Sequence, residues 1–68
     1  MVKVTSIVVN PKTQTALVSL FADTKEEVQE GMTIEGFPTG YEIEFGSNVL
    51  TASGELAFVK SNGTFNWV

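Results

Sequence analysis

Cysteine, histidine and arginine are all absent from this chain of 68 residues. Without cysteine there is no disulfide, and without cysteine or histidine the usual tetrahedral zinc ligand sets cannot form. A serine or threonine nucleophile would need one of the four lysines as its activating base. The missing arginine also removes the planar fork that grips carboxylate and phosphate groups. The sequence therefore predicts no catalytic, cofactor or metal site, and a protein that is not an enzyme.

Positive charge is scarce as well: the chain has four lysines and eight acidic residues, and its net charge is -4. This balance opposes the phosphate neutralisation that drives nucleic-acid binding, so we expect no DNA or RNA partner. No segment approaches the roughly 20 apolar residues of a membrane span, and no signal-peptide core follows the first residues. We therefore expect a protein of cytoplasmic origin without a signal peptide or membrane association.

The remaining composition is that of a folded domain, with 43% hydrophobic and 18% charged residues. At the usual size of domains, residues 1–68 form one small β domain. A chain of this length buries only about 60% of the surface that its unfolded form exposes, so its core is thin. Self-association would be a natural supplement to such a core.

The first third of the chain predicts a β-hairpin. Residues 2–9 are rich in β-branched side chains, and residues 10–12 (Asn-Pro-Lys) are typical of a turn. A second strand is expected from about Thr15 to Phe21. The short polar connection favours pairing of the two strands.

The middle of the chain has weaker patterns. Thr24 and Glu27 match a capping box, which predicts at most one short helix near residues 24–30, a polar turn being an equally fair interpretation. Glycine and proline punctuate residues 32–45, which predicts a loop with one short strand around residues 41–44.

The last third predicts a three-stranded meander. Apolar runs at residues 48–52, 55–60 and 64–68 are separated by Ser53-Gly54 and Asn62-Gly63. The Asn-Gly pair is the strongest short hairpin signal, because a type I′ turn needs positive φ at both central positions. Two-residue turns at both sites align the following residues in one structural row on one face: Val49, Phe58 and Trp67, with Thr51, Leu56 and Phe65 on the same face. The expected fold is mainly β, a small antiparallel sheet, sandwich or barrel of about five strands.

The opposite face of this meander is also apolar, unlike the polar surface of a sheet with one side in water. Packing of the N-terminal hairpin on this face, as in a small sandwich or barrel, is the favoured interpretation; the alternative is an oligomer interface, and both can hold at once. The candidate interface consists of Leu50, Ala57, Val59 and Val68, with the loop aromatics Phe37 and Tyr41. For these two aromatics, packing beneath the central loop is the favoured alternative to contact with a partner.

Carboxylates are the only plentiful reactive groups. Glu42 and Glu44 share a strand face, but no cation lies near them in sequence, so a solvated edge is favoured over an acid/base pair. The acidic residues between 23 and 30 lack the Asp-x-Asp-x-Asp-Gly pattern of a calcium loop. We expect no specific metal.

Residues 21–68 resemble small proteins encoded among the virion genes of tailed bacteriophages and prophages. The resemblance lies in the Asp23-Thr24 segment, a strand opened by Gly46-Ser47, a strand opened by Gly54-Glu55, and the ending at residues 61–67, Ser-Asn-Gly-Thr-Phe-Asn-Trp. The typical ending there is Ser-Asp-Gly-Thr-Trp, so this chain has Asn62 in place of Asp and Phe65 in place of Trp. The resemblance implies a head decoration, head fibre or tail-region protein without a catalytic motif.

The leading hypothesis is thus a virion-associated structural or assembly protein, located in the virion or in the host cytoplasm during assembly. Its partners would be further copies of itself, as a homo-oligomer, and capsid or tail proteins. The alternative is a small acidic inhibitor or decoy that binds a basic host protein through its carboxylates, with binding that collapses as salt is added.

Overall fold

The computed structural model describes residues 1–60 and 64–68, and this part of the chain is mainly β, as the sequence predicts. The strands are β1 (Val2–Asn10), β2 (Thr15–Ala22), β3 (Ile34–Glu35), β4 (Glu42–Ile43), β5 (Asn48–Thr51), β6 (Leu56–Val59) and β7 (Phe65–Trp67). The one helical element among the described residues is a three-residue 3-10 helix, η1 (Lys25–Glu27), inside the predicted range. The predicted turn at Asn62-Gly63 lies outside the described residues.

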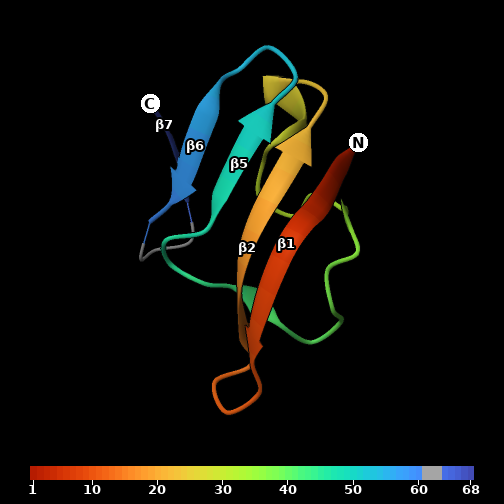
Figure 1. Ribbon diagram of the computed structural model, residues 1–68, viewed down its shortest axis with the longest axis vertical. Helices are drawn as coiled ribbons and strands as arrows, with labels where there is room; N and C mark the ends of the chain where they lie inside the picture. Colours follow the sequence, from red (N-terminus) through yellow and green to blue (C-terminus); the bar gives the residue numbers. More distant parts are fainter. Residues whose placement is uncertain (61–63) are drawn as a thin grey trace.

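The predicted N-terminal hairpin is confirmed. Strands β1 and β2 pair antiparallel along their whole length, from Val2 opposite Ala22 to Asn10 opposite Thr15. The Asn10 side chain accepts a hydrogen bond from the Lys12 N–H at 3.1 Å, which closes the first part of the connection. A register shift between Val4 and Ser6 interrupts the ladder near its upper end. The hairpin is therefore a long, twisted ribbon with one bulge (Figure 1).

Hairpin and meander belong to one sheet, because β2 pairs with β5 in parallel (Figure 1). Ser19 to Ala22 lie beside Asn48 to Thr51. Further down β2, the short β4 pairs with Thr15 and Ala16, also in parallel. The result is a mixed, open sheet in the order β3-β1-β2-β5-β6-β7, with β4 on β2. The favoured expectation, in which the N-terminal hairpin packs over the back of the meander, is wrong, because β2 pairs edge to edge with β5 and places the hairpin in the same sheet.

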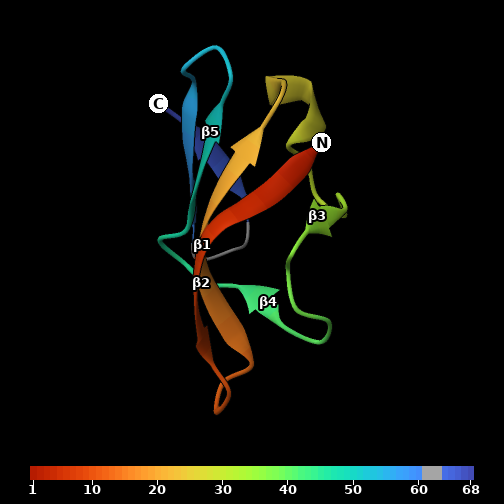
Figure 2. The ribbon, with the colours of Figure 1, turned by 45° about the vertical axis from the view of Figure 1, so that its right-hand side comes forward.

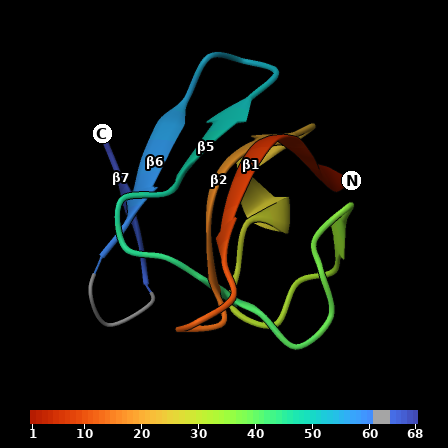
Figure 3. The same cartoon turned by 60° about the horizontal axis from the view of Figure 1, so that its bottom comes forward.

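The core lies on one side of this sheet. Every second residue of β2 is buried: Ala16, Val18, Leu20 and Ala22. The other strands add the buried residues Val2, Val49, Ala57 and Val59. The chain between β2 and β5, with η1, β3 and β4, lies over this side (Figures 2 and 3). It contributes the buried Val28 and the partly buried Met32, Ile34 and Phe37. A two-layer unit results, sheet on one side and crossover segment on the other.

Ser47 holds the junction where β2, β5 and β6 meet. Its fully buried hydroxyl accepts a hydrogen bond from the Val18 N–H at 3.0 Å, and its carbonyl accepts one from the Val59 N–H at 2.8 Å. Along this edge of β2 the partner strand changes, because β4 pairs as far as Ala16 and β5 pairs from Ser19 onward. The Val18 N–H lies between the two partners and would have no backbone acceptor. A serine hydroxyl supplies the missing acceptor.

The meander is confirmed, but its register is one residue away from the prediction. At Ser53-Gly54, the Thr51 N–H donates to the Glu55 carbonyl at 2.9 Å, and the Gly54 N–H donates to the Thr51 carbonyl at 3.0 Å. Gly54 has a φ of 88°. This is a three-residue loop, a turn followed by a left-handed glycine, rather than a two-residue turn. The Thr51 hydroxyl also accepts the Glu55 N–H at 3.0 Å and so stabilises the longer loop.

Because side chains alternate along a strand, the extra residue in this loop reverses the two faces of β6, and an equal change in the connection after β6 leaves β7 on its predicted face. Val49 lies opposite Ala57, and Ala57 lies opposite Trp67. Val49, Thr51, Phe65 and Trp67 therefore do share one face, as predicted, but Ala57 and Val59 take the places assigned to Phe58 and Leu56. The predicted row of Val49, Phe58 and Trp67 is therefore wrong, because Ala57 lies between Val49 and Trp67. The second connection also spans three residues, since the Lys60 N–H donates to the Thr64 carbonyl at 2.9 Å.

Replacing Ser47 with alanine is expected to lower the free energy of unfolding by about 1–3 kcal/mol, because it leaves the buried Val18 N–H without an acceptor. Chemical denaturation of the wild type and Ser47→Ala measures the difference. Ser6→Ala, an equal truncation at an exposed position of β1, is the matched control and is expected to change stability by less than about 0.5 kcal/mol. Equal effects of the two substitutions would contradict the role given to Ser47.

Candidate interaction surface

The side of the sheet opposite the core carries a set of apolar side chains on neighbouring strands, which we call the outer face. Its residues come from four neighbouring strands and are Val8, Leu17, Phe21, Leu50, Leu56 and Phe58. The register places Val8 beside Leu17, Phe21 beside Leu50, and Leu50 beside Leu56. No other described segment lies over this side of the central strands (Figure 2).

Exposure of the outer face is high for apolar side chains in strands. Val8 is 67% exposed, and Leu17, Leu50 and Phe58 are between 42% and 45% exposed. Ser19 and Asn48 separate the pair Val8 and Leu17 from the group of Phe21, Leu50, Leu56 and Phe58. Single exposed apolar residues are ordinary on any surface, but groups of them on neighbouring strands are typical of an interaction site. The outer face is therefore the main candidate site of this chain.

Charge is nearly absent from the outer face. Along β1, β2, β5, β6 and β7, Lys3 is the one charged residue among the described side chains that alternate away from the core. Its ammonium lies 5.9 Å from the centre of the Phe21 ring, a cation-π contact at the upper margin. The other outward residues are small and uncharged, and include Ser6, Ser19, Asn48 and Asn66. All eight carboxylates belong to loops, to η1 or to the short marginal strands β3 and β4.

The predicted interface residues divide between the two sides of the sheet. Leu50 is on the outer face as expected, and Val68 is 89% exposed and continues β7 beside Leu56. Ala57 and Val59 were assigned to the same surface wrongly, because the longer Ser53-Gly54 loop turns them into the core. Phe58 and Leu56 replace them.

The loop aromatics follow the favoured interpretation. Phe37 and Tyr41 are partly buried and pack against the hydrophobic core beneath the crossover segment. Phe45, the third aromatic of this loop, is 67% exposed. Phe37 and Tyr41 therefore stabilise the cover of the core and leave little ring surface for a partner.

A cleft of about 580 Å³ opens on the crossover side. Glu30, Met32, Ile34, Ile43 and Phe65 are among the residues that line it, together with Gln29, Gly31 and Glu42. Its walls are mostly apolar, and its two carboxylates have no ion-pair partner among the described residues. Glu44 is absent from the lining, so Glu42 and Glu44 do not meet there as an acid/base pair.

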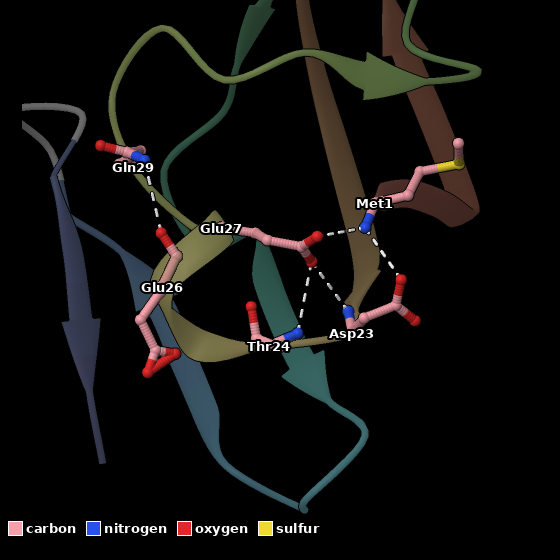
Figure 4. Close-up of polar contacts among 6 residues, drawn as sticks. All are labelled: Met1, Asp23, Thr24, Glu26, Glu27 and Gln29. Atoms are coloured by element: carbon pink, nitrogen blue, oxygen red, sulfur yellow. Dashed lines mark hydrogen bonds and ion pairs between the residues drawn. The ribbon is translucent and has the colours of Figure 1, made fainter.

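Polar contacts hold the start of β1 to η1 (Figure 4). The Met1 ammonium donates to the Asp23 carboxylate at 2.8 Å and also contacts the Glu27 carboxylate. The other oxygen of Glu27 accepts the N–H groups of Asp23 at 3.1 Å and Thr24 at 3.3 Å, which is the glutamate half of the predicted capping box. Glu27 thus joins Met1, the residue that precedes β1, to the crossover segment.

These contacts shift three ionisation equilibria. Hydrogen bonds from the Met1 ammonium to Asp23 and Glu27 raise the pKa of the amine from its ordinary value of 8.0. The same ammonium lowers the pKa of Asp23 from 3.8 and that of Glu27 from 4.5. The Met1 amine and Asp23 are exposed and Glu27 is half-buried at the surface, so water and salt screen their contribution.

Lys25 joins η1 to the far side of the meander. Its ammonium lies 4.9 Å from the centre of the Trp67 ring and 4.0 Å from a Glu55 carboxylate oxygen. Both contacts are half exposed and individually weak. They position the Trp67 ring rather than create a reactive centre.

Metal-binding geometry is not found among residues 1–60 and 64–68, where no three carboxylates come together as a ligand set. Asp23 and Glu27 are engaged by the Met1 ammonium instead of converging with Glu26 and Glu30. Within the same residues, no helix has the length and apolar character needed to cross a bilayer.

Comparison with known proteins gives no relatives: no protein-family model, no curated protein and no solved structure matches this chain.

The contacts of the Met1 amine are expected to give stability a flat maximum between about pH 5 and pH 8. The amine has a raised pKa in the folded chain, so its contribution is complete below 8.0 and is lost as pH rises through the raised pKa. The carboxylates have lowered pKa values, so their contribution is complete above 4.5 and is lost as pH falls through those values.

Denaturation midpoints of the free and Nα-acetylated chains, measured from pH 3 to pH 10, test this expectation. Acetylation removes the positive charge, so the acetylated chain is expected to be less stable than the free chain at neutral pH, with the difference shrinking toward both extremes. A difference that does not depend on pH would show that the amine does not act through its charge.

Proposed function

We propose that this chain is a non-enzymatic structural component that works by associating with further copies of itself through the outer face. The observation that carries the proposal is the uncovered apolar surface of Leu17, Leu50 and Phe58 on the back of the sheet. With the virion-type resemblance of residues 21–68, it supports a part of a phage or prophage particle. In that setting, capsid or tail proteins are the further partners, and the virion or the host cytoplasm is the location.

A sheet with one face on its own core and one apolar face in water is half of a sandwich. Two such faces packed together, about 10 Å apart, bury both sets of side chains. The thin core of a small domain gains stability from the same step, because association removes further apolar surface from water. Self-association therefore serves both the stability of the subunit and the growth of an assembly.

The distribution of charge favours a second copy as the occupant. Two chains that each carry a net charge of -4 repel one another, except where their facing surfaces lack carboxylates. The outer face is such a surface. Contact through it keeps the acidic loops of both copies at the margins, where water and salt screen them.

The acidic inhibitor or decoy is less well supported. Asp23 and Glu27 are engaged by the Met1 ammonium, and Glu55 is held by Ser53 and Lys25. The remaining carboxylates are spread over loops and marginal strands rather than arrayed on one face. A phosphate-like array needs regularly spaced, unpaired charges, which the described residues do not supply.

Wild-type protein is expected to sediment as a concentration-dependent oligomer at micromolar levels, and Leu50→Glu is expected to raise its dissociation constant at least tenfold. A charge in the centre of an apolar contact loses hydration without gaining a partner, and each 1.4 kcal/mol of that cost is a factor of ten. Analytical ultracentrifugation measures both chains, with thermal unfolding to show that each is folded.

Thr39→Glu is the matched control, since it adds the same charge at an exposed loop position on the other side of the molecule from the outer-face strands. It is expected to leave the dissociation constant within about twofold of the wild type. A wild-type chain that stays monomeric up to about 1 mM would overturn the proposal of self-association.

The virion assignment has its own test in the neighbouring genes. Head, portal or tail genes on either side of this gene would support it. A metabolic operon in that place would contradict it without touching the proposal of self-association.

A further inference from the structure

Strand β1 has a second surface, its hydrogen-bonding edge, which is distinct from the outer face. On one side β1 pairs with β2 from end to end. On the other side it pairs with β3 at Val2 and Lys3 alone. Beyond the bulge between Val4 and Ser6, the edge from Ser6 to Asn10 has no strand beside it among the described residues, and Figure 1 shows β1 at the margin of the sheet. We call this segment, residues 6–10, the open edge.

The open edge lacks the features that normally protect such an edge from pairing. It contains no charged residue and no proline, and the single bulge lies above it. Its central residues are β-branched and well exposed: Ile7 is 38%, Val8 67% and Val9 46% exposed. Outward-pointing N–H and C=O groups along such a strand are a template for another extended strand.

We infer that the open edge pairs with the open edge of a second copy, antiparallel and about a two-fold axis at Val8, so that two sheets join into one. This inference rests on the proposed self-association and names a second contact for it. Antiparallel pairing of a strand with itself is self-complementary, because each residue that contacts its partner is contacted in the same way.

The sequence of β1 suits this pairing. With the axis at Val8, Val8 lies opposite its own copy, Ile7 lies opposite Val9, and Ser6 lies opposite Asn10. The two lysines of the hairpin, Lys3 and Lys12, lie outside the five paired residues, so no like charges are directly opposed. The first acidic residue of the chain is Asp23, so the whole hairpin brings no carboxylate to the contact.

The other free edge of the sheet is a poorer partner. Strand β7 has three residues, and Lys25 lies over the Trp67 ring at its end. Head-to-tail pairing of β1 with β7 would match three residues, whereas pairing of β1 with its copy matches five. The longer ladder favours the closed, two-fold arrangement over an open filament.

Single cysteines test the geometry directly, because the natural chain has none. Residues on the axis of an antiparallel pair have Cα atoms about 4.5–5.5 Å apart, within disulfide range. Among Ser6→Cys, Ile7→Cys and Val8→Cys, at least one chain is expected to form a disulfide dimer under mild oxidation ten or more times faster than Thr39→Cys, which places its thiol on an exposed loop. Circular dichroism establishes that each variant is folded.

Rates at all three positions no faster than that of Thr39→Cys would overturn the edge pairing. The outcome is separable from that of the proposed function. If the wild type associates but none of the three chains is cross-linked rapidly, the edge inference fails alone. If cross-linking is rapid and Leu50→Glu leaves association unchanged, the outer-face contact fails while the edge pairing stands.

Discussion

Parallel pairing of β2 with β5 is the constraint on which the rest of this structure depends. It joins a two-stranded hairpin, which is marginally stable alone, and a meander into one sheet with a common core face. It also aligns Phe21 with Leu50, and so makes one outer face from two halves of the chain. Because parallel strands need a crossover, the same pairing requires the segment from Asp23 to Ser47 to pass over the sheet, where it covers the core. Ser47 secures the joint by accepting the Val18 N–H.

Local patterns in the sequence were enough to predict most of the elements. The β-branched run of β1, the turn after it and the apolar strands of the meander each have a signal within a few residues, and Thr24 with Glu27 placed the short helix. The parallel joining of β2 to β5 has no such signal. It links residues about 30 positions apart through a loop of irregular sequence. Both phases of β2 contain large apolar residues, because Leu17 and Phe21 alternate with Thr15 and Ser19, so alternation along β2 is a weak signal of the buried side. Predicting the core face required the partner strand.

The candidate site was predicted in part, and its error has one physical cause. The Ser53-Gly54 pair predicted a turn correctly but not its length, because the Thr51 hydroxyl and the left-handed Gly54 favour a three-residue loop. With one extra residue in this loop, Ala57 lies in the core where Phe58 was predicted, and Phe58 lies on the outer face. The expectation that both sides of the meander are apolar survives this exchange, since β6 has apolar residues in both phases. The identity of the surface residues does not.

The proposed function depends on the outer face being a contact surface between copies of the chain. Solvent paramagnetic relaxation, measured by NMR on the side chains of Leu17, Leu50 and Phe58, tests this most directly. In dilute protein a soluble paramagnetic agent is expected to broaden these signals strongly. In concentrated protein they are expected to become protected, while the loop around Thr39 stays accessible. Equal broadening of the outer-face signals at both concentrations would contradict the account.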